Sequence, residues 1–152
     1  MTWYNVVARS CTVWERRSHI KIQKKWYIIL NLTWGCIMTA IGFVASTVIM
    51  ALGYKPKQHK LAHYFLIPGK WGGITLGTTI IVCNETQHLL DHEFGHTLQN
   101  ALFGIFMPFI GIASFVRATM RRIQQKNGKL LPPYDSVWWE SQATHWGEDC
   151  RY

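Results

Sequence analysis

Residues 74–96, ITLGTTIIVCNETQHLLDHEFGH, contain the strongest signals for both fold and chemistry in this chain. The first nine of these residues are rich in β-branched side chains and predict a strand over 74–82. A short polar connection follows, in which Asn84 or Thr86 can cap a helix. That helix contains the sequence HEFGH, where His92 and His96 are separated by one helical turn.

The HEFGH sequence matches the pattern HExxH, whose spacing suits a metal ion. A helix projects His92 and His96 from one face, so both imidazoles can reach one tetrahedral Zn²⁺. Glu93 then lies beside the metal-bound water, where a carboxylate can act as general base. The alternative is an exposed helix that carries these residues by coincidence. We favour the metal site, because zinc peptidases also place a strand and a turn before this helix, and that strand can pair with an extended substrate.

Length and composition indicate one small domain in contact with a membrane. The chain has 152 residues, of which 49% are hydrophobic and only 16% charged, against about 25% charged in ordinary soluble domains. Its net charge of +8 is spread over basic residues that flank apolar segments, which suits anionic lipid headgroups better than nucleic acid. The four cysteines form no CxxC pair, so neither a disulfide framework nor a cysteine zinc site is expected. We therefore expect membrane lipid as a partner and no nucleic acid.

The N-terminal third predicts a membrane anchor. Residues 1–25 are basic and polar and are expected to form a cytoplasmic tail, whereas 26–53 contain no charged residue. That run exceeds the roughly 20 residues that span a bilayer, and it is longer than the apolar region of a cleaved signal peptide. We predict a transmembrane helix over 26–53, with a buried soluble helix as the alternative. The six Lys or Arg before it, against four lysines after it, favour an N-terminus on the inside.

Residues 54–152 are expected to form a minimal zincin-like domain. A strand at 63–66 and the strand at 74–82 precede the HExxH helix, which should run from about Thr86 past Gln99. The apolar segment 98–116 is long enough for a second transmembrane helix, but Pro108 near its centre favours two half-helices in a re-entrant or buried hairpin. A full crossing would also carry every later residue ~30 Å away from the histidines. A basic helix end at 117–129, a loop and a last helix over 136–147 should follow.

A catalytic zinc usually takes three protein ligands and leaves one position for water. Glu140 is the best candidate for the third ligand, because it lies on the last helix beside two tryptophans that would anchor that helix. The small residues Ala143 and Thr144 would allow this helix to pack closely. His145 is the alternative, either as the ligand itself or as a contact to substrate or to an oxyanion. The remaining candidates after His96 are Asp135, Glu148 and Asp149.

His88 precedes His92 by one helical turn, which would place three histidines along one helix face. His88 and His96 would be separated by ~12 Å along the axis, since each residue rises about 1.5 Å. They cannot both bind one ion. We therefore expect His88 to be a neighbouring or surface residue and not a ligand.

The order of several segments resembles a group of small membrane proteins of bacteria and phages, which carry an HExGH helix and a later W-[FW]-E-x-Q-A-T segment. The segments are GYKP, GKWGGITLG, HEFGHTLQN, MPFIGIASFVR and PPYDSVWWESQATHWG. The resemblance covers about residues 28–147, and the group is similar to gluzincin-type zinc metallopeptidases. It implies that His92, His96 and Glu140 bind zinc, that Glu93 is the base, and that the chain lies in a bacterial inner membrane. The resemblance does not imply an enzymatic activity, so a peptidase function is inferred from the site residues.

Together these features predict an α+β fold. One N-terminal transmembrane helix would precede a zincin-like domain made of a short sheet, the HExxH helix, an apolar re-entrant or buried hairpin and a C-terminal ligand helix. The leading functional hypothesis is a membrane-anchored zinc metallopeptidase acting on a peptide or protein substrate. The alternative is a membrane protein whose structural or vestigial zinc site serves partner binding. Proteolysis within the bilayer is a third hypothesis, which Asp91 and Gln99 beside the motif disfavour.

Overall fold

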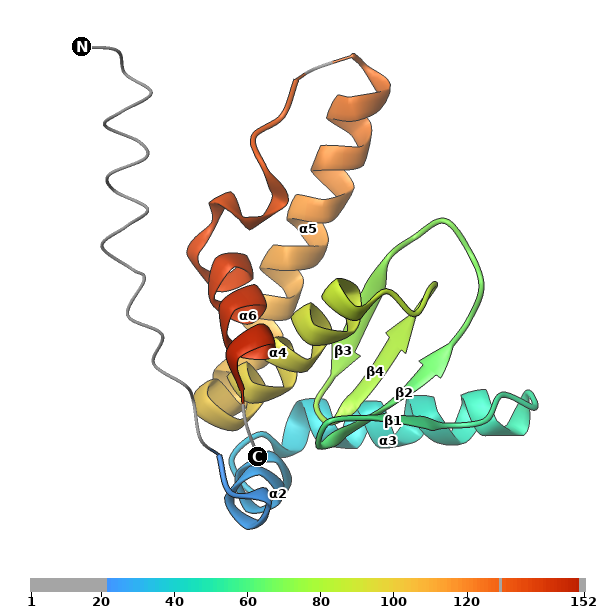
Figure 1. Cartoon of the computed structure of the whole chain (residues 1–152), viewed down its shortest axis with the longest axis vertical. Coiled ribbons are helices and arrows are strands. Elements are labelled where there is room, and N and C mark those ends of the chain that lie inside the picture. Colours follow the sequence, from blue (N-terminus) through green and yellow to red (C-terminus); the bar gives the residue numbers. More distant parts are fainter. Residues whose placement is uncertain (1–21, 129, 151–152) are drawn as a thin grey trace.

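The computed structural model describes residues 22–128 and 130–150, so nearly all of the expected tail of residues 1–25 lies outside the described part. The described chain is a mixed α+β fold, as expected, in which helices pack against a small sheet (Figure 1). In chain order the elements are α2 Lys24–Leu32, α3 Cys36–Ala51, β1 Lys57–His59, β2 Ala62–Leu66, β3 Gly73–Leu76, β4 Thr79–Val82, α4 Gln87–Phe103, η2 Gly104–Phe106, α5 Met107–Lys126, η3 Tyr134–Ser136 and α6 Trp138–Asp149.

The sheet has the strand order β1-β2-β4-β3. β1 and β2 are antiparallel, β3 and β4 are antiparallel, and the central strands β2 and β4 are parallel. The strand expected at 63–66 is therefore present as β2. β3 forms an edge of the sheet, so one side of its backbone faces away from the other strands.

The prediction of a single strand over 74–82 is wrong, because this segment forms a hairpin of β3 and β4. The chain turns at Gly77, whose φ of 62° lies in the left-handed region that glycine adopts without steric cost. A side chain at this position would also collide with the backbone of Thr39 in α3. The hairpin makes β3 a short edge strand beside the HExxH helix.

The expected continuous helix over 26–53 is also replaced by two helices, α2 and α3, which are bent by 92°. A buried polar cluster holds the bend: the Asn100 side-chain amide donates to Asn31 Oδ1 at 2.7 Å and to Gly35 O at 3.2 Å. A side chain at Gly35 would collide with Asn100. Trp34 in the same bend donates from Nε1 to Leu102 O at 3.0 Å. Asn31 and Trp34 of this apolar run are therefore used for packing against α4.

The apolar segment 98–116 is divided between the end of α4 and the start of α5, but the division does not fall at Pro108, where the half-helix interpretation placed it. The division falls at Gly104, whose φ is 54° and beside which Trp34 leaves no room for a side chain. Pro108 lies in the first turn of α5, where its missing N–H costs no helical hydrogen bond. Among the described residues, Gln87–Lys126 is the helical stretch long and apolar enough to span a membrane, and the bent α2–α3 pair would be a second if counted as one span.

The core lies on both faces of the sheet. On one face, α2 and α4 pack against the strands, and Phe94 of the HExxH motif stacks on Tyr27 with ring centroids 6.1 Å apart. On the other face, Ile49 of α3 packs against Phe65 and Ile81. α4 is thus buried from Leu90 to Ala101, which fixes the direction in which its histidines point.

α6 packs against α4 at two glycines, Gly95 and Gly147. A side chain at Gly95 would collide with the backbone of Ala143, and one at Gly147 would collide with the carbonyl of Asp91. The glycine of HEFGH therefore allows α6 to approach α4 closely. Ala143 is fully buried in this contact, in agreement with the small residues expected there.

Replacing Gly95 with Ala should lower both thermal stability and zinc content. The added methyl group would push α6, and with it Glu140, away from the histidines, and overpacking of this kind typically costs about 1–3 kcal/mol. Thermal unfolding and metal analysis of the purified variant measure the two effects. Gly111→Ala is the matched control, because a side chain there meets only Met38 at 4.0 Å. Equal stability and zinc content in the two variants would contradict the close packing.

Candidate metal centre

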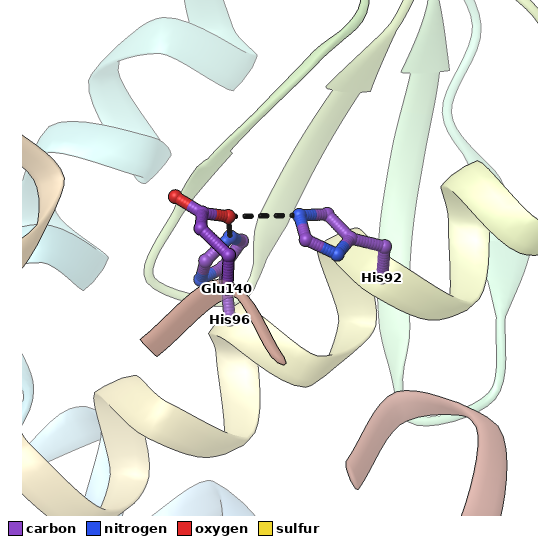
Figure 2. A group of neighbouring side chains, drawn as sticks. All are labelled: His92, His96 and Glu140. Atoms are coloured by element: carbon purple, nitrogen blue, oxygen red, sulfur yellow. Dashed lines mark ion pairs between the residues drawn. The ribbon is translucent and has the colours of Figure 1, made fainter. Parts of the chain in front are cut away.

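Three buried side chains from two helices converge on one another (Figure 2). α4 supplies His92 and His96, whose rings lie 4.8 Å apart and nearly perpendicular. α6 supplies Glu140, whose Oε2 lies 3.2 Å from His92 Nε2 and 3.4 Å from His96 Nε2. Glu140, which the sequence favoured as the third ligand, is therefore brought to the histidine pair by the close packing of α6.

The residues fit a bound cation. Glu140 is fully buried, and its Oε2 has no hydrogen-bond partner. Two nitrogens and a carboxylate oxygen are donors that zinc prefers, at about 2.0–2.2 Å from the ion. In a tetrahedral site of that size, ligand atoms are roughly 3.3 Å apart, close to the two distances from Oε2 to the histidines. A buried carboxylate oxygen that lies between two imidazole nitrogens is a donor set that could hold a metal ion.

Hydrogen bonds on the outer side of each ring orient the two histidines. His96 Nδ1 donates to Gln99 Oε1 at 2.8 Å, while the Gln99 amide nitrogen donates to Trp139 O at 2.7 Å, which fixes the orientation of the amide. His92 Nδ1 lies 2.8 Å from Thr144 Oγ1. In the neutral ring, a proton on Nδ1 leaves Nε2 of His96 with the lone pair that a metal requires. Such outer hydrogen bonds are typical of histidines that bind zinc.

The carboxyl of Glu140 is held in its charged form. Burial alone would raise its pKa, but the imidazoles of His92 and His96 hold the pKa well below its usual range. An anionic ligand is therefore present at neutral pH, as metal binding requires.

Glu93 lies on the same turn of α4 and is held by the edge strand. Thr75 in β3 donates from its hydroxyl to Glu93 Oε2 at 2.6 Å, and Gly73 leaves room for the carboxylate, since a side chain there would collide with it. Glu93 is buried but lines the same cavity as His92 and His96. Its carboxylate is therefore fixed beside the metal ligands without being one of them.

Tyr134 is a site residue that the sequence did not single out. Its hydroxyl donates to Glu140 Oε1 at 3.4 Å, and its ring lies 6.1 Å from that of His92. Burial, followed by the charges of Glu140 and Glu93, raises its pKa, so the hydroxyl keeps its proton. Arg117 holds the loop in place by donating to Tyr134 O at 3.1 Å. The only signal in the sequence was the position of this tyrosine directly before the ligand helix.

The other candidate ligands lie elsewhere. His145 is half exposed and pairs with Asp149 at 3.2 Å, and neither residue lines the cavity. His88 pairs with Glu148 at 3.0 Å on the surface, as expected for a histidine that is not a ligand. The side chain of Asp135 lies outside the described part of the structure. Among the described side chains, His92, His96 and Glu140 are the only group that converges in this way.

Asp91, directly before the motif, anchors α4 to the sheet. Its Oδ1 accepts from Lys60 Nζ at 2.6 Å and lies 2.9 Å from His59 Nε2. Lys60 also donates to Gly147 O of α6. One lysine thus joins the β1–β2 turn to both ligand helices, which explains the buried acid beside the histidines.

A cavity of about 620 Å³ opens over the site. Its walls are β3, α4, α5 and the loop that carries Tyr134, with Met38 of α3 at one end. No family model, curated protein or solved structure matches this chain. The resemblance to small gluzincin-like membrane proteins therefore stays a prediction, and the function has to be argued from the site.

Proposed function

We propose that this chain is a membrane-anchored zinc metallopeptidase. The observation that carries the proposal is the convergence of His92, His96 and Glu140, with Glu93 held beside them in an open cavity. Among the described side chains only three donors converge, which would leave a fourth position for water or substrate. A structural zinc site normally has four protein ligands, so this arrangement favours the catalytic alternative over the structural one.

In the proposed peptide hydrolysis, each residue around the site has a separate role. Zinc, when bound, supplies a Lewis acid and lowers the pKa of water towards ~7. Glu93 takes a proton from the attacking water and passes it to the leaving amine as the C–N bond breaks. Because Thr75 holds Oε2 of this carboxylate, Oε1 is left for the proton. Tyr134 keeps its proton and lines the cavity, so on substrate binding its hydroxyl would turn from Glu140 Oε1 to the carbonyl oxygen of the substrate.

The edge strand β3 supports a peptide as the substrate. It pairs only with β4 within the sheet, and residues 72–75 line the cavity beside Glu93. An extended peptide can add to such an edge by main-chain hydrogen bonds. Hydrolysis of a peptide library by the purified, zinc-loaded chain tests the proposal, with Glu93→Gln as the matched inactive variant. A chain that binds zinc but cleaves no peptide in the library would favour the structural alternative.

Exposed apolar side chains support attachment to a membrane. The solvent-facing sides of α3 and α5 carry a series of them: Ile37, Ile41, Phe43, Val44, Val48, Met50, Phe109, Ile112, Phe115, Val116, Met120 and Ile123. Exposed apolar side chains that follow one another along a helix suit contact with a membrane, and Lys24 and Lys25 precede Trp26 at the start of α2. In the most apolar window of Gln87–Lys126 only 17% of the residues are buried, so most of that surface is free to meet lipid.

The chain should float with lipid vesicles and stay bound in high salt. Replacing both Phe43 and Phe109 with Glu should lower the bound fraction, because each charge at the centre of a membrane helix costs roughly 2.5–3.5 kcal/mol. Leu130→Glu is the control, since this fully exposed leucine lies outside α3 and α5. Release of the wild-type chain by salt alone would show that only charge attracts it to lipid and would contradict apolar insertion.

A further inference from the structure

The wall of the cavity changes from apolar to basic along its length. α5 runs the whole way, supplying Met107 and Ile110 from its first turns and Arg121 and Arg122 from its last. Met38 of α3 belongs to the apolar end, because its side chain lies beside the position of Gly111. His92, Glu93 and His96 of α4 line the same cavity.

β3 forms the opposite wall of the cavity, and its two ends lie at the same basic and apolar ends as those of α5. Arg122 donates to Trp71 O at 2.5 Å, so the residues just before β3 lie at the basic end. The other end of β3 is followed by Gly77, which packs against Thr39 of α3. β3 and α5 therefore run in opposite directions along one cavity, and a peptide added to β3 would extend from the α3 end to the arginines.

The two arginines are held in place by neutral groups. Arg121 donates to Pro132 O at 2.7 Å and its guanidinium lies 5.6 Å from the centre of the Tyr134 ring, while Arg122 is held by the Trp71 carbonyl. Among the side chains that the structure describes, no carboxylate pairs with either arginine. Two positive charges are therefore fixed in the wall of the cavity, with no partner of opposite sign among the described side chains.

We propose that the cavity selects peptides that have apolar residues on one side of the scissile bond and a carboxylate on the other. The apolar residues would lie against Met38, Met107 and Ile110, and the carboxylate would be bound by Arg121 and Arg122. A guanidinium can hold a carboxylate by two parallel hydrogen bonds, which makes this pair both strong and specific. The proposal rests on the proposed peptidase function only in taking the ligand to be a peptide.

A lipid headgroup is the other anionic group that arginines of α5 can meet. The geometry favours the peptide, because Arg121 and Arg122 line the same cavity as His92 and Glu93. Lys126, on the last turn of the same helix, is exposed and does not line the cavity. It therefore serves as a cation that lipid can reach equally well but that a bound peptide does not need.

Binding can be measured without hydrolysis by using the full-length, zinc-loaded Glu93→Gln chain in a non-ionic detergent. The probes are fluorescent octapeptides in which four apolar residues precede four residues that include either two Glu or two Gln. A second set places the four apolar residues last. We expect the Glu peptide of one order to bind about tenfold more tightly than its Gln counterpart. The order that shows this preference gives the direction in which the peptide lies.

The double variant Arg121→Gln and Arg122→Gln should lose the preference, whereas Lys126→Gln should keep it. In the chain that keeps both arginines, added salt should weaken the preference for the Glu peptide. This test does not depend on whether the double variant folds.

Equal binding of Glu and Gln peptides in both orders would overturn the proposal even if the wild-type chain cleaves peptides. If the Glu peptide binds more tightly but the wild-type chain cleaves no peptide, the proposed binding site stands and the proposed peptidase function is wrong. A double variant that loses binding to anionic vesicles but keeps the peptide preference would assign the arginines to lipid.

Discussion

Replacing Glu93 with Gln should reduce peptide hydrolysis by about 10²–10⁴-fold while the chain keeps its zinc. The amide has nearly the same shape as the carboxylate, and its oxygen can still accept the hydrogen bond that Thr75 donates to Glu93 Oε2 at 2.6 Å. What the amide lacks is the ability to take a proton at neutral pH. The loss should therefore fall on the rate of the chemical step, with little change in peptide binding.

The Glu93→Gln experiment needs a carboxylate control from outside the site. Glu85 is suitable, because it is held by Lys57 at 2.6 Å and by the Tyr64 hydroxyl at 2.8 Å and does not line the cavity. Glu85→Gln should hydrolyse peptides at the wild-type rate. Rates of wild type and both variants, measured with zinc content determined on the same samples, separate catalysis from folding. A Glu93→Gln chain that cleaves as fast as wild type would contradict the role of general base and favour a structural or vestigial site.

Most of the convergence of the candidate metal ligands could be predicted from the sequence, because the signals of the two histidines are local. His92, Glu93 and His96 lie within one helix, where spacing alone determines which side chains share a face. Glu140 required a contact between distant helices, which the two neighbouring tryptophans and the small residues Ala143 and Thr144 indicated. Gly95 of the motif allows this contact, because the absence of a side chain leaves room for Ala143 on α6.

The features that the sequence missed depend on contacts between segments far apart in the chain. Gly77 converts an apparently continuous β-branched run into a hairpin, and Gly35 allows a 92° bend in a run that hydropathy alone describes as one helix. Both glycines are required by a partner, Thr39 for one and Asn100 for the other, which no local pattern reveals. Tyr134 was missed for the same reason, because only the packing of its loop against α5 brings the hydroxyl to Glu140.

The purified chain should contain about one zinc ion, and removing both His92 and His96 should abolish zinc binding. The loss should be complete because one carboxylate alone makes a weak site for zinc, which is usually held by three or four protein ligands. Glu140→Ala should also lower the zinc content, since it removes the only described oxygen donor that faces both imidazoles. Metal analysis after dialysis measures all of these variants.

His88→Ala is the matched control for the ligand variants. His88 lies one turn before His92 on α4, but its Nδ1 pairs with Glu148 at 3.0 Å on the surface, so the variant should keep its zinc. His145→Ala should also keep zinc, because this half-exposed residue pairs with Asp149. Loss of zinc from His145→Ala together with retention in Glu140→Ala would overturn the assignment of the third ligand. Equal zinc in wild type and in the His92→Ala and His96→Ala double variant would exclude the metal centre itself, and with it the peptidase mechanism that depends on it.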